Sequence, residues 1–445
     1  MEDILTLLDR RKDSDWLHDR NGREFYQKVA FYHDRFRERS LHILLAESDP
    51  FEFLAIFLAG IASECSIFLG NPDWKRGEWE QVFALVRPDL VFGATVPSIE
   101  NSSVSKLDFP PSILIPTGGT SGKIRFAIHT RETLGASVAG FREYFGVDRV
   151  NSFCILPLYH VSGLMQFLRC FWTEGYFLNI PYSELKKERI KNLDFSEYFI
   201  SLVPTQLQFF LDKDPGWLTR FKAVLLGGAP AWLSLLEKAR QYKIPLSPTY
   251  GMTETASQVV TVKPEEFLAG NNSNGRVLPH ARIRIDEFDR TVKIEAKSLF
   301  LGYYPHRERS SVFQTDDVGY FDGDNYLYII GRNSQKIITG GENVFPLEVE
   351  TAIRETGLVK DVVVRGVSDR GWGQAIVAFY VSIDDGIVPS LIQEKIKDKI
   401  ARYKHPKHWI KLDRIPKNPQ GKINQKFLDE LWNETIAKGR IPRNS

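Results

Sequence analysis

The chain has 445 residues, and its 58 lysines and arginines nearly balance its 56 aspartates and glutamates. Apolar residues make up 43% and charged residues 26%, which is ordinary for a soluble globular protein. The length predicts two or more domains, and the net charge of +2 argues against nucleic acid or a membrane surface as the main partner.

Two further features bear on the cellular compartment. The cysteines Cys65, Cys154 and Cys170 lack metal-ligand or redox spacing and have apolar neighbours, so we expect buried thiols in a reducing compartment. The N-terminus has no basic segment before an apolar run, and the most apolar stretch, Phe53–Gly60, is much shorter than the roughly 20 residues that span a bilayer. We therefore expect a cytoplasmic protein with no membrane insertion.

The chain up to residue 92 predicts alternating helices and strands. Residues 1 to about 40 have helical spacing in places, and we expect Phe25, Val29, Phe31 and Tyr32 to face one core. The next expected elements are a strand over His42–Ala46, a helix and then a strand between Phe51 and Phe68, a helix over Gln81–Val86 and a strand over Leu90–Phe92. This alternation is typical of an α/β domain with much parallel sheet.

A glycine-rich loop follows the apolar run that begins at Ile113. Its residues are Thr117, Gly118, Gly119, Thr120, Ser121, Gly122 and Lys123. Glycine lets backbone N–H groups approach phosphate oxygens, the hydroxyls donate hydrogen bonds, and the lysine adds positive charge. The spacing differs from the P-loop G-x-x-x-x-G-K-S/T, because Thr117 stands at the first glycine and Ile124 follows the lysine. We predict a phosphate-binding loop of another kind; the alternative is a surface turn.

Two elements after the loop are relevant to a site. Ala127–Thr130 predicts a strand returning from a hairpin, and Thr130 or Thr133 predicts the cap of a helix that runs through Phe145. A buried strand that begins at Ser152 has His160 just past its end, where the sites of α/β folds collect. A lone histidine is nevertheless more often structural.

A later strand, which starts at Ala223, ends in the small residues Gly227, Gly228 and Ala229. A flat ring can lie against such a backbone. Equally, the glycine pair can simply precede a helix that begins at Pro230, because proline favours a first helical turn. The residues alone leave both interpretations open.

Tyr250, Thr253 and Glu254 lie close together in the next segment. The tyrosine offers a stacking face for a base or ribose, and the threonine offers a hydroxyl to a phosphate. The glutamate is a hard oxygen ligand, suited to Mg²⁺ held jointly with phosphate oxygens. An ordinary turn with a solvated glutamate is the alternative, which the nearby glycine-rich loop disfavours.

The last third of the chain predicts a domain boundary. β structure is expected from Gly275 through Ile294, and a later strand ends at Gly331, with Arg332 placed to reach ribose or phosphate. A charged link and Gly340-Gly341 follow, so we predict domains of residues 1–331 and 332–445. In the second domain we expect helices over Leu347–Glu355 and Pro389–Tyr403, strands over Asp361–Val367 and Gln374–Ser382, and a rigid loop that presents Lys422. A surface lysine is ordinarily just solvated.

These motifs, in this order, resemble the signatures of the adenylate-forming superfamily, which includes acyl-CoA synthetases, luciferases and the adenylation domains of peptide synthetases. The residues Thr117–Lys123 resemble its phosphate-binding signature, although Lys123-Ile-Arg-Phe departs from the usual G-K-P-K-G continuation. Tyr250, Gly251, Thr253 and Glu254 match every fixed position of its Y-G-x-T-E motif. The resemblance covers nearly the whole chain. It implies a large multi-layer N-terminal α/β domain and a small, mobile C-terminal α+β domain.

The resemblance also implies roles for single residues. His160 matches the histidine of P-L-x-H, which lies between the acyl substrate and the phosphates, and Gly228 and Ala229 would touch adenine. Asp317 matches the ribose-binding aspartate of T-G-D-x-G-Y, with Asp316 in place of the glycine as a rival. Ser334 occupies the hinge position, usually Asp or Lys. Gly340 and Gly341 would line the pantetheine tunnel for CoA, and Lys422 would bind the substrate carboxylate and the α-phosphate.

The parts predict a reaction that uses ATP and Mg²⁺, and the resemblance implies a second step that uses CoA. No Ser-His-Asp triad, cysteine nucleophile with a base, or kinase signature is visible in the sequence. A substrate carboxylate would attack the α-phosphorus of ATP, while Lys422 and Mg²⁺ neutralise charge. The products would be an acyl-adenylate and pyrophosphate, and CoA would then take the acyl group. We expect Lys422, Thr253 and Glu254 to be the catalytic residues.

The acyl substrate is suggested by the stretch Thr117–Thr130, which looks like that of the o-succinylbenzoate–CoA ligases of menaquinone and phylloquinone biosynthesis. The second carboxylate of this acid needs a cation or hydrogen-bond donors, for which His160 and Arg125 are candidates. The alternatives are another aryl- or acyl-CoA ligase, and a nucleotide-binding module without turnover. The sequence does not indicate the oligomeric state, and a homodimer is a working hypothesis.

Overall fold

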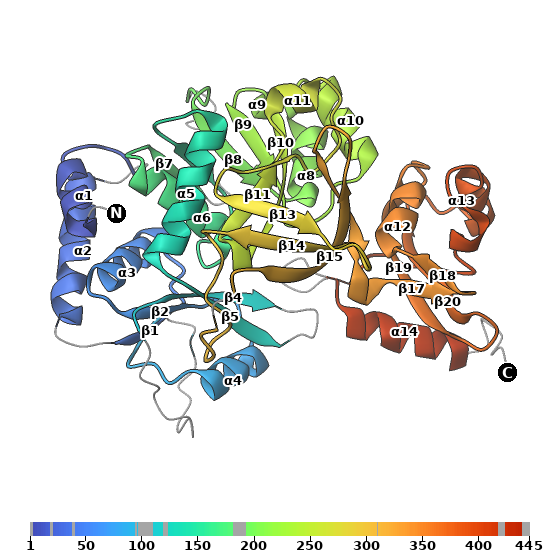
Figure 1. Cartoon of the computed structure of the whole chain (residues 1–445), viewed down its shortest axis with the longest axis horizontal. Helices are drawn as coiled ribbons and strands as arrows, with labels where there is room; N and C mark the ends of the chain where they lie inside the picture. The colour runs from blue at the N-terminus through green and yellow to red at the C-terminus, as the bar shows by residue number, and fades with distance from the viewer. Residues whose placement is uncertain are drawn as a thin grey trace.

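The computed structural model describes residues 3–17, 21–37, 41–93, 96, 110–118, 123–180, 193–308, 310–416 and 423–437. These residues form three sheets with covering helices in the larger part of the molecule, and a fourth sheet in a smaller C-terminal part (Figure 1). This mixed arrangement confirms the predicted α/β fold class.

The first sheet has the strand order β3-β1-β2-β4-β5. β3, β1, β2 and β4 pair in parallel, and β5 pairs antiparallel with β4. Both β1 and β2 are buried along their whole length, as expected for parallel strands covered on both faces. The elements of this part are α1 (Ile4–Arg11), α2 (Gly22–Phe36), β1 (His42–Leu45), α3 (Pro50–Ala62), β2 (Ser66–Leu69), α4 (Arg76–Leu85), β3 (Leu90–Phe92), β4 (Ile113–Gly118) and β5 (Ile124–His129).

The second sheet has the order β12-β11-β10-β9-β8-β6-β7. Its strands from β10 to β7 are parallel, whereas β11 and β12 turn back antiparallel. Its elements are α5 (Arg131–Phe145), β6 (Asn151–Cys154), α6 (Val161–Trp172), β7 (Phe177–Asn179), β8 (Tyr198–Leu202), α8 (Pro204–Lys213), α9 (Pro215–Leu218), β9 (Ala223–Leu226), α10 (Leu233–Gln241), β10 (Leu246–Met252), the 3₁₀ turn η2 (Thr253–Thr255), β11 (Ser257–Thr261), α11 (Pro264–Leu268) and β12 (Arg276–Val277).

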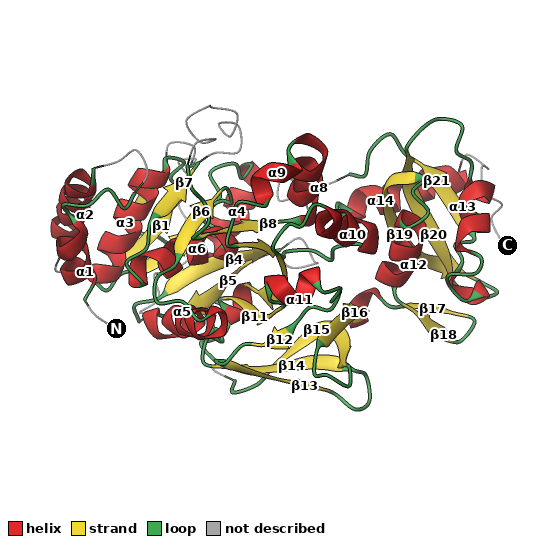
Figure 2. Ribbon diagram, turned by 90° about the horizontal axis from the view of Figure 1, so that it is seen from above, coloured by secondary structure: helices red, strands yellow, loops and turns green. Residues whose placement is uncertain are grey.

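The third sheet is antiparallel, in the order β13-β14-β15-β16, and it leads into the C-terminal part. There a sheet runs β18-β17-β20-β19, with β21 paired to β20. Seen from above, this part lies beyond α10 and β16 at one end of the molecule (Figure 2). The elements are β13 (Ala281–Ile285), β14 (Thr291–Ala296), β15 (Phe313–Phe321), β16 (Leu327–Arg332), η3 (Asn333–Gln335), β17 (Ile337–Thr339), β18 (Glu342–Val344), α12 (Pro346–Arg354), β19 (Val359–Asp369), β20 (Gly373–Ser382), α13 (Pro389–Ile396), η4 (Arg402–Lys404), β21 (His408–Lys411) and α14 (Gln425–Ala437).

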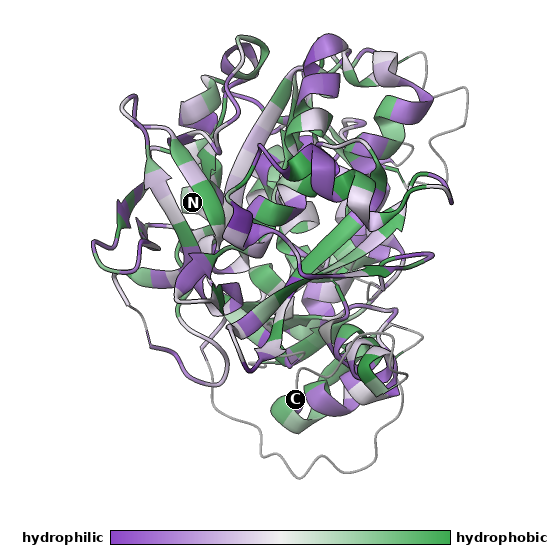
Figure 3. Cartoon of the chain, turned by 90° about the vertical axis from the view of Figure 1, so that its right-hand side faces the viewer, coloured by the Kyte–Doolittle hydropathy of each residue, from purple (hydrophilic) through white to green (hydrophobic). Residues whose placement is uncertain are grey.

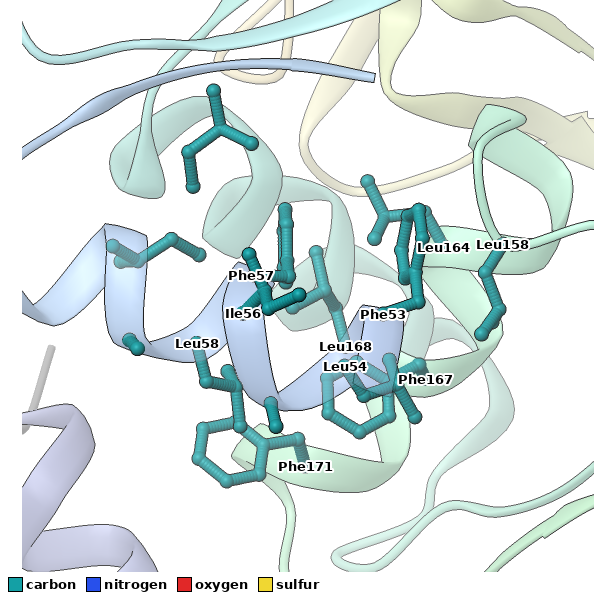
Figure 4. Packing of buried hydrophobic residues seen from close by; sticks show 14 of the residues in the cluster. Phe53, Leu54, Ile56, Phe57, Leu58, Leu158, Leu164, Phe167, Leu168 and Phe171 are labelled. Atoms are coloured by element: carbon teal, nitrogen blue, oxygen red, sulfur yellow. The ribbon is translucent and has the colours of Figure 1, made fainter. Parts of the chain in front are cut away.

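The hydrophobic core packs around α6, the helix that carries part of the candidate site. Figure 4 shows side chains of α3, among them Phe53 and Phe57, meeting those of α6, among them Phe167 and Phe171. Burial of each such side chain contributes about 1.5–3 kcal/mol. Hydropathy colouring shows the same division, with hydrophobic stretches in the inner strands and hydrophilic ones along the outer loops (Figure 3). The core thus fixes α6 firmly beneath the second sheet.

Several sequence-based predictions about elements are confirmed. Thr130 is the N-cap of α5 and pairs with Thr133 in a capping box. The strand that returns from the hairpin is β5, and the cysteines are buried and free. None of the helices that the structure describes is both long and apolar enough to cross a membrane.

Two predictions about elements are wrong. Phe31 is 60% exposed, because it lies two residues from the buried Val29 and so on the opposite side of α2. The helix predicted over Pro389–Tyr403 ends at Ile396: the Lys399 N–H donates to the Ile396 carbonyl three residues back, Ala401 has the non-helical ψ of 144°, and η4 follows. Of the two interpretations left open for Gly227-Gly228, the one with a helix beginning at Pro230 is not observed, because α10 begins at Leu233.

Candidate functional site

The glycine-rich loop connects two paired strands at the edge of the first sheet. Thr117 lies opposite Arg125, and Gly118 lies opposite Ile124, so the loop is the tip of the β4–β5 hairpin. Lys123 is exposed at the start of the returning strand. The predicted residues Gly119, Thr120, Ser121 and Gly122 lie outside the described residues. The hairpin therefore positions both ends of the loop.

Tyr250, Asp317 and Arg332 come together from the second and third sheets. The Tyr250 hydroxyl donates to Asp317 Oδ2 at 2.8 Å, and Arg332 Nε donates to Asp317 Oδ1 at 3.2 Å. Asp317 is only 9% exposed. Burial and the Asp317 carboxylate raise the pKa of Tyr250 well above its ordinary value, so the phenol stays protonated and keeps donating. Three predicted nucleotide residues, far apart in sequence, thus share one hydrogen-bonded group.

The neighbouring acid, Asp316, faces elsewhere. Along a strand, successive side chains point to opposite faces. The backbone N–H of Ser334 donates to Asp316 Oδ1 at 2.9 Å, and the Ser334 hydroxyl donates to Asp316 Oδ2. Of the two candidate acids, only Asp317 lies with Tyr250 and Arg332.

Glu254 lies on η2, directly after β10. It is 7% exposed, and its Oε1 accepts a hydrogen bond from the Tyr303 hydroxyl at 2.6 Å. The Arg125 guanidinium lies 4.1 Å from the centre of the Tyr303 ring, which brings positive charge to the same side. Burial, followed by the Glu254 charge, raises the pKa of Tyr303, which therefore remains a donor. Local sequence gave no signal for Tyr303, because it stands 49 residues from Glu254.

The Glu254 site fits Mg²⁺ only if another molecule supplies most of the ligands. Among the residues that the structure describes, no group of three or more His, Cys, Asp or Glu side chains could hold a metal ion. Mg²⁺ is commonly held by one or two carboxylates together with substrate phosphates. A single buried carboxylate next to the β4–β5 hairpin has the chemistry for that arrangement.

Gly228 and Ala229 follow the carboxyl end of β9, beside β10. Leu226 pairs with Pro248, so the two residues lie next to the segment that carries Tyr250. Gly228 has φ +80°, which a residue with a side chain rarely adopts, and Ala229 is exposed. His160 is the N-cap of α6, and its ring centroid lies 4.6 Å from that of Tyr159.

Arg169 was not predicted, and the structure gives it an unusual environment. It lies on α6 with 2% exposure, and its Nη2 donates to Ser257 Oγ at 3.2 Å and Gln258 Oε1 at 3.1 Å. Its Nε is buried without a partner, and no acidic side chain pairs with it in the described part of the chain. Burial lowers its pKa to about 9. An arginine in the middle of an apolar helix is the sequence signal that could have drawn attention to it.

Ser334, Gly340 and Gly341 lie at the entry to the C-terminal part. Ser334 is on η3, the short link between β16 and β17. Gly340 (φ +59°) and Gly341 (φ +84°) form the two-residue turn between β17 and β18, where both positions need positive φ. This turn is a structural reason for the glycine pair. Lys422 lies outside the described residues.

Comparison with known proteins gives matches over most of the chain. Residues 108–297 match the family described as AMP-binding enzyme, and residues 348–422 match the AMP-binding enzyme C-terminal domain. A 2-succinylbenzoate–CoA ligase of Listeria innocua is 34% identical over 424 residues, which cover 88% of this chain and 89% of the relative.

Two similar solved structures are of o-succinylbenzoate CoA synthetase (MenE) from Bacillus subtilis. One, in complex with the acyl-adenylate intermediate OSB-AMP, has a TM-score of 0.79 at 22% identity and covers 96% of this chain and 98% of that chain. The other, in complex with ATP and a magnesium ion, has a TM-score of 0.77 at 22% identity and covers 96% and 99%. At this identity the likeness establishes the fold.

Proposed function

This chain belongs to the family of AMP-binding enzymes, and we propose that within this family it is the ATP-dependent ligase that joins o-succinylbenzoate to CoA in menaquinone or phylloquinone biosynthesis. The support for the acid is a relative, the 2-succinylbenzoate–CoA ligase of Listeria innocua, whose match covers 88% of this chain. The support for adenylation is the site itself. Tyr250, Asp317 and Arg332 form one bonded group for a nucleoside, and Glu254 lies on the same strand-to-turn segment as Tyr250.

The proposed reaction has two steps. A carboxylate oxygen of the acid attacks the α-phosphorus of ATP, the bond to the β-phosphate oxygen breaks, and pyrophosphate leaves. The thiol of CoA then attacks the acyl carbon, loses its proton, and displaces AMP. Positioning and charge neutralisation suffice for such transfers, so the protein needs no covalent nucleophile.

Each site residue receives a role in this proposal. Asp317 accepts hydrogen bonds from the ribose hydroxyls, Tyr250 stacks on the nucleoside, and Gly228 with Ala229 borders adenine. Thr253 and the residues from Thr117 to Lys123 bind phosphate oxygens, and Arg332 reaches ribose or phosphate. Glu254 holds Mg²⁺ together with ATP, and His160 lies between the acyl group and the phosphates.

The C-terminal part supplies the remaining roles. We propose that residues 332–445 form the small domain, with Ser334 as its hinge. Lys422 binds the carboxylate and α-phosphate during adenylation, and Gly340 with Gly341 borders the pantetheine arm of CoA. A cytoplasmic location and a homodimer belong to the same proposal, and light scattering of the purified protein tests the dimer.

The test of function is pyrophosphate release that depends on ATP, acid and CoA. We expect strong selectivity for o-succinylbenzoate over benzoate, cinnamate and medium-chain fatty acids, and loss of release in Lys422→Ala. Release with a different acid would keep the chemistry and replace the substrate. No release with any acid would leave a nucleotide-binding protein without turnover.

The second carboxylate of o-succinylbenzoate needs a partner, and Arg169 fits this need better than the two candidates predicted from sequence. Arg125 is exposed and lies over the Tyr303 ring, and His160 is an N-cap residue. Arg169, by contrast, is a buried cation without an acidic partner among the described residues, and it is hydrogen-bonded to Ser257 and Gln258 just after η2. A buried charge is costly unless an opposite charge completes it.

A thermodynamic cycle tests this assignment. The arginine variant is Arg169→Met, and the ligand variants are the two half-acids, 3-benzoylpropionate with only the chain carboxylate and 2-butyrylbenzoate with only the ring carboxylate. We expect Arg169→Met to lower kcat/KM for o-succinylbenzoate by roughly tenfold to a hundredfold, the value of a charged hydrogen bond. Arg169→Met should change kcat/KM little for the half-acid that the enzyme still adenylates, because that acid has no second carboxylate to lose a partner. Equal losses with both acids would show that Arg169 is structural.

A further inference from the structure

The turn that carries Thr253 and Glu254 is held from outside by donors that belong to other elements. His129 Nε2, on β5, lies 2.8 Å from the Thr253 carbonyl oxygen. The backbone N–H of Phe300 donates to the Glu254 carbonyl at 2.9 Å. The Ser137 hydroxyl, on α5, donates to the Ala256 carbonyl at 2.7 Å. Three carbonyls of one short turn are thus bound by three separate segments.

His129 can act at Thr253 in only one tautomer. A carbonyl oxygen accepts and cannot donate, so Nε2 must carry the proton. Nδ1 is then an acceptor, and it lies 3.0 Å from the Thr133 hydroxyl, which can donate to it. The ring is fully buried. Burial lowers its pKa to about 4, so the ring is neutral at neutral pH and this tautomer persists.

The position of His129 links two parts of the site. It is the last residue of β5, the strand that returns from the glycine-rich loop, and it lies opposite Ile113 at the start of β4. Its bond to Thr253 therefore sets the distance between the hairpin and the turn. The Thr253 hydroxyl and the Glu254 carboxylate both project from the backbone that this bond fixes. Small displacements of such groups have large effects on rate.

We infer that His129 is a positioning residue for the adenylation step, which holds the Thr253–Glu254 turn in register with the phosphate-binding hairpin through its hydrogen bond to the Thr253 carbonyl. The inference rests on the proposed function, because it takes Thr253 and Glu254 as the groups that meet MgATP. It does not require o-succinylbenzoate to be the acid. His129 itself touches neither the acid nor the nucleotide.

Two conservative variants separate this role from general stability. In His129→Gln, the side-chain amide reaches the place of Nε2 and can still donate to the Thr253 carbonyl. In His129→Asn, the amide reaches only the place of Nδ1, so the Thr253 carbonyl loses its link to β5 and keeps only the Ala256 N–H, a donor within the turn itself. His42→Gln is the matched control, because His42 is also a buried histidine but lies on β1, away from the turn.

The experiment measures each half-reaction and, separately, binding. We expect His129→Asn to slow acid-dependent exchange of pyrophosphate into ATP by roughly tenfold to a hundredfold. Thioester formation from supplied acyl-adenylate and CoA should stay within about twofold, and His129→Gln should recover most of the exchange rate. In calorimetric titrations, the affinity for a non-hydrolysable MgATP analogue should fall by a similar factor in His129→Asn. It should change little in His129→Gln or His42→Gln.

Two outcomes would overturn the inference. One is an equal loss in His129→Gln and His129→Asn, and the other is a proportional fall of both half-reactions. Failure of the proposed function looks different, because the unaltered enzyme would then release no pyrophosphate with any acid. In that case the binding titration still decides whether His129 positions the turn.

Discussion

The Thr253–Ala256 turn and the linker around Ser334 hold their polar groups in opposite ways. In the turn, buried donors from β5, α5 and the Phe300 segment each bind one carbonyl. In the linker, Ser334 meets a single acid, Asp316, and both residues are exposed. Losing a buried partner leaves an unpaired group that water cannot reach, whereas water replaces an exposed partner. The same kind of substitution should therefore cost much in the turn and little in the linker.

The largest expected effect is a loss of stability in acid, which arises from the buried region. The pKa values of His129 and His280 are lowered from 6.5 to about 4, chiefly by burial and, at His280, also by the nearby Arg169 charge. Between pH 6.5 and 4 the unfolded chain binds protons that the folded chain does not. Stability is therefore complete above pH 6.5 and falls as the pH drops, by about 3 kcal/mol per histidine at pH 4.

Urea unfolding at a series of pH values measures this slope. Carboxylates add to the loss at the acid end, so the decisive quantity is the difference between the unaltered chain and His280→Gln, which lacks one of the two groups. A shallower slope in the variant is expected. Identical slopes would mean that His280 does not stay neutral in the folded chain.

The next largest effect should separate the two neighbouring acids of β15. Asp317→Asn removes the charge that binds Tyr250 and Arg332 and, in our proposal, the ribose. Hydrogen bonds to charged groups contribute about 1.5–3 kcal/mol, so we expect the KM for ATP to rise roughly tenfold to a hundredfold. Asp316→Asn is the matched control and should change that KM by less than about twofold. Similar changes in the KM for ATP would show that the buried and the exposed carboxylate of β15 contribute equally to ATP binding.

This contrast also explains what could be predicted from sequence. The fully buried strand β1 was predicted to within one residue, because burial leaves a local apolar pattern. The contiguous motifs predicted nucleotide roles for Tyr250 and Asp317, and the structure brings these two residues into one hydrogen bond, while their roles stay predictions. The end of α13 was missed, because the apolar residues continue past the point where the backbone tightens into a turn and Ala401 leaves the helical conformation.

The supporting residues could not be predicted in the same way. His129 meets Thr253 across 124 positions, and Arg169 meets Ser257 across 88. Such contacts depend on how the sheets pack, which no local spacing encodes. Asp316 and Ser334 are a further example: each departs from the resembling signatures at its own position, and only the structure pairs them.

A smaller effect is expected at the β17–β18 turn. Both glycines have positive φ, which costs about 1 kcal/mol or somewhat more for alanine. A Cβ on Gly340 would also lie 2.7 Å from the Trp372 ring, whereas a Cβ on Gly341 would meet nothing within 4 Å. Lys407 Nζ lies 3.5 Å from the centre of this ring, so moving the ring aside would give up the cation–π contact.

Gly340→Ala should therefore destabilise the C-terminal part more than Gly341→Ala, by about 2 kcal/mol against about 1 kcal/mol. Hydrogen exchange of the amides in β17 and β18 measures the difference. In our proposal the turn borders CoA, so thioester formation should slow more than adenylation. An equal effect of the two variants would show that Trp372 moves aside.

The smallest effect should come from Ser334, and there the order of variants is more informative than the size. Ser334→Ala removes one exposed hydroxyl bond to Asp316, so we expect a stability loss below about 1 kcal/mol. Ser334→Asp would place two carboxylates side by side, whereas Ser334→Lys would place a cation beside Asp316. The linker conformation in the structure should therefore be least stable in Ser334→Asp and of intermediate stability in Ser334→Ala. In Ser334→Lys it should be at least as stable as in the unaltered chain.

Limited proteolysis at the linker and the ratio of the two half-reaction rates measure this order, and 1 M salt should compress it because exposed charges are screened. If the order disappears in Asp316→Asn, the carboxylate of Asp316 is its cause. If Asp and Lys behave alike at Ser334, the Asp316–Ser334 bond does not govern the linker.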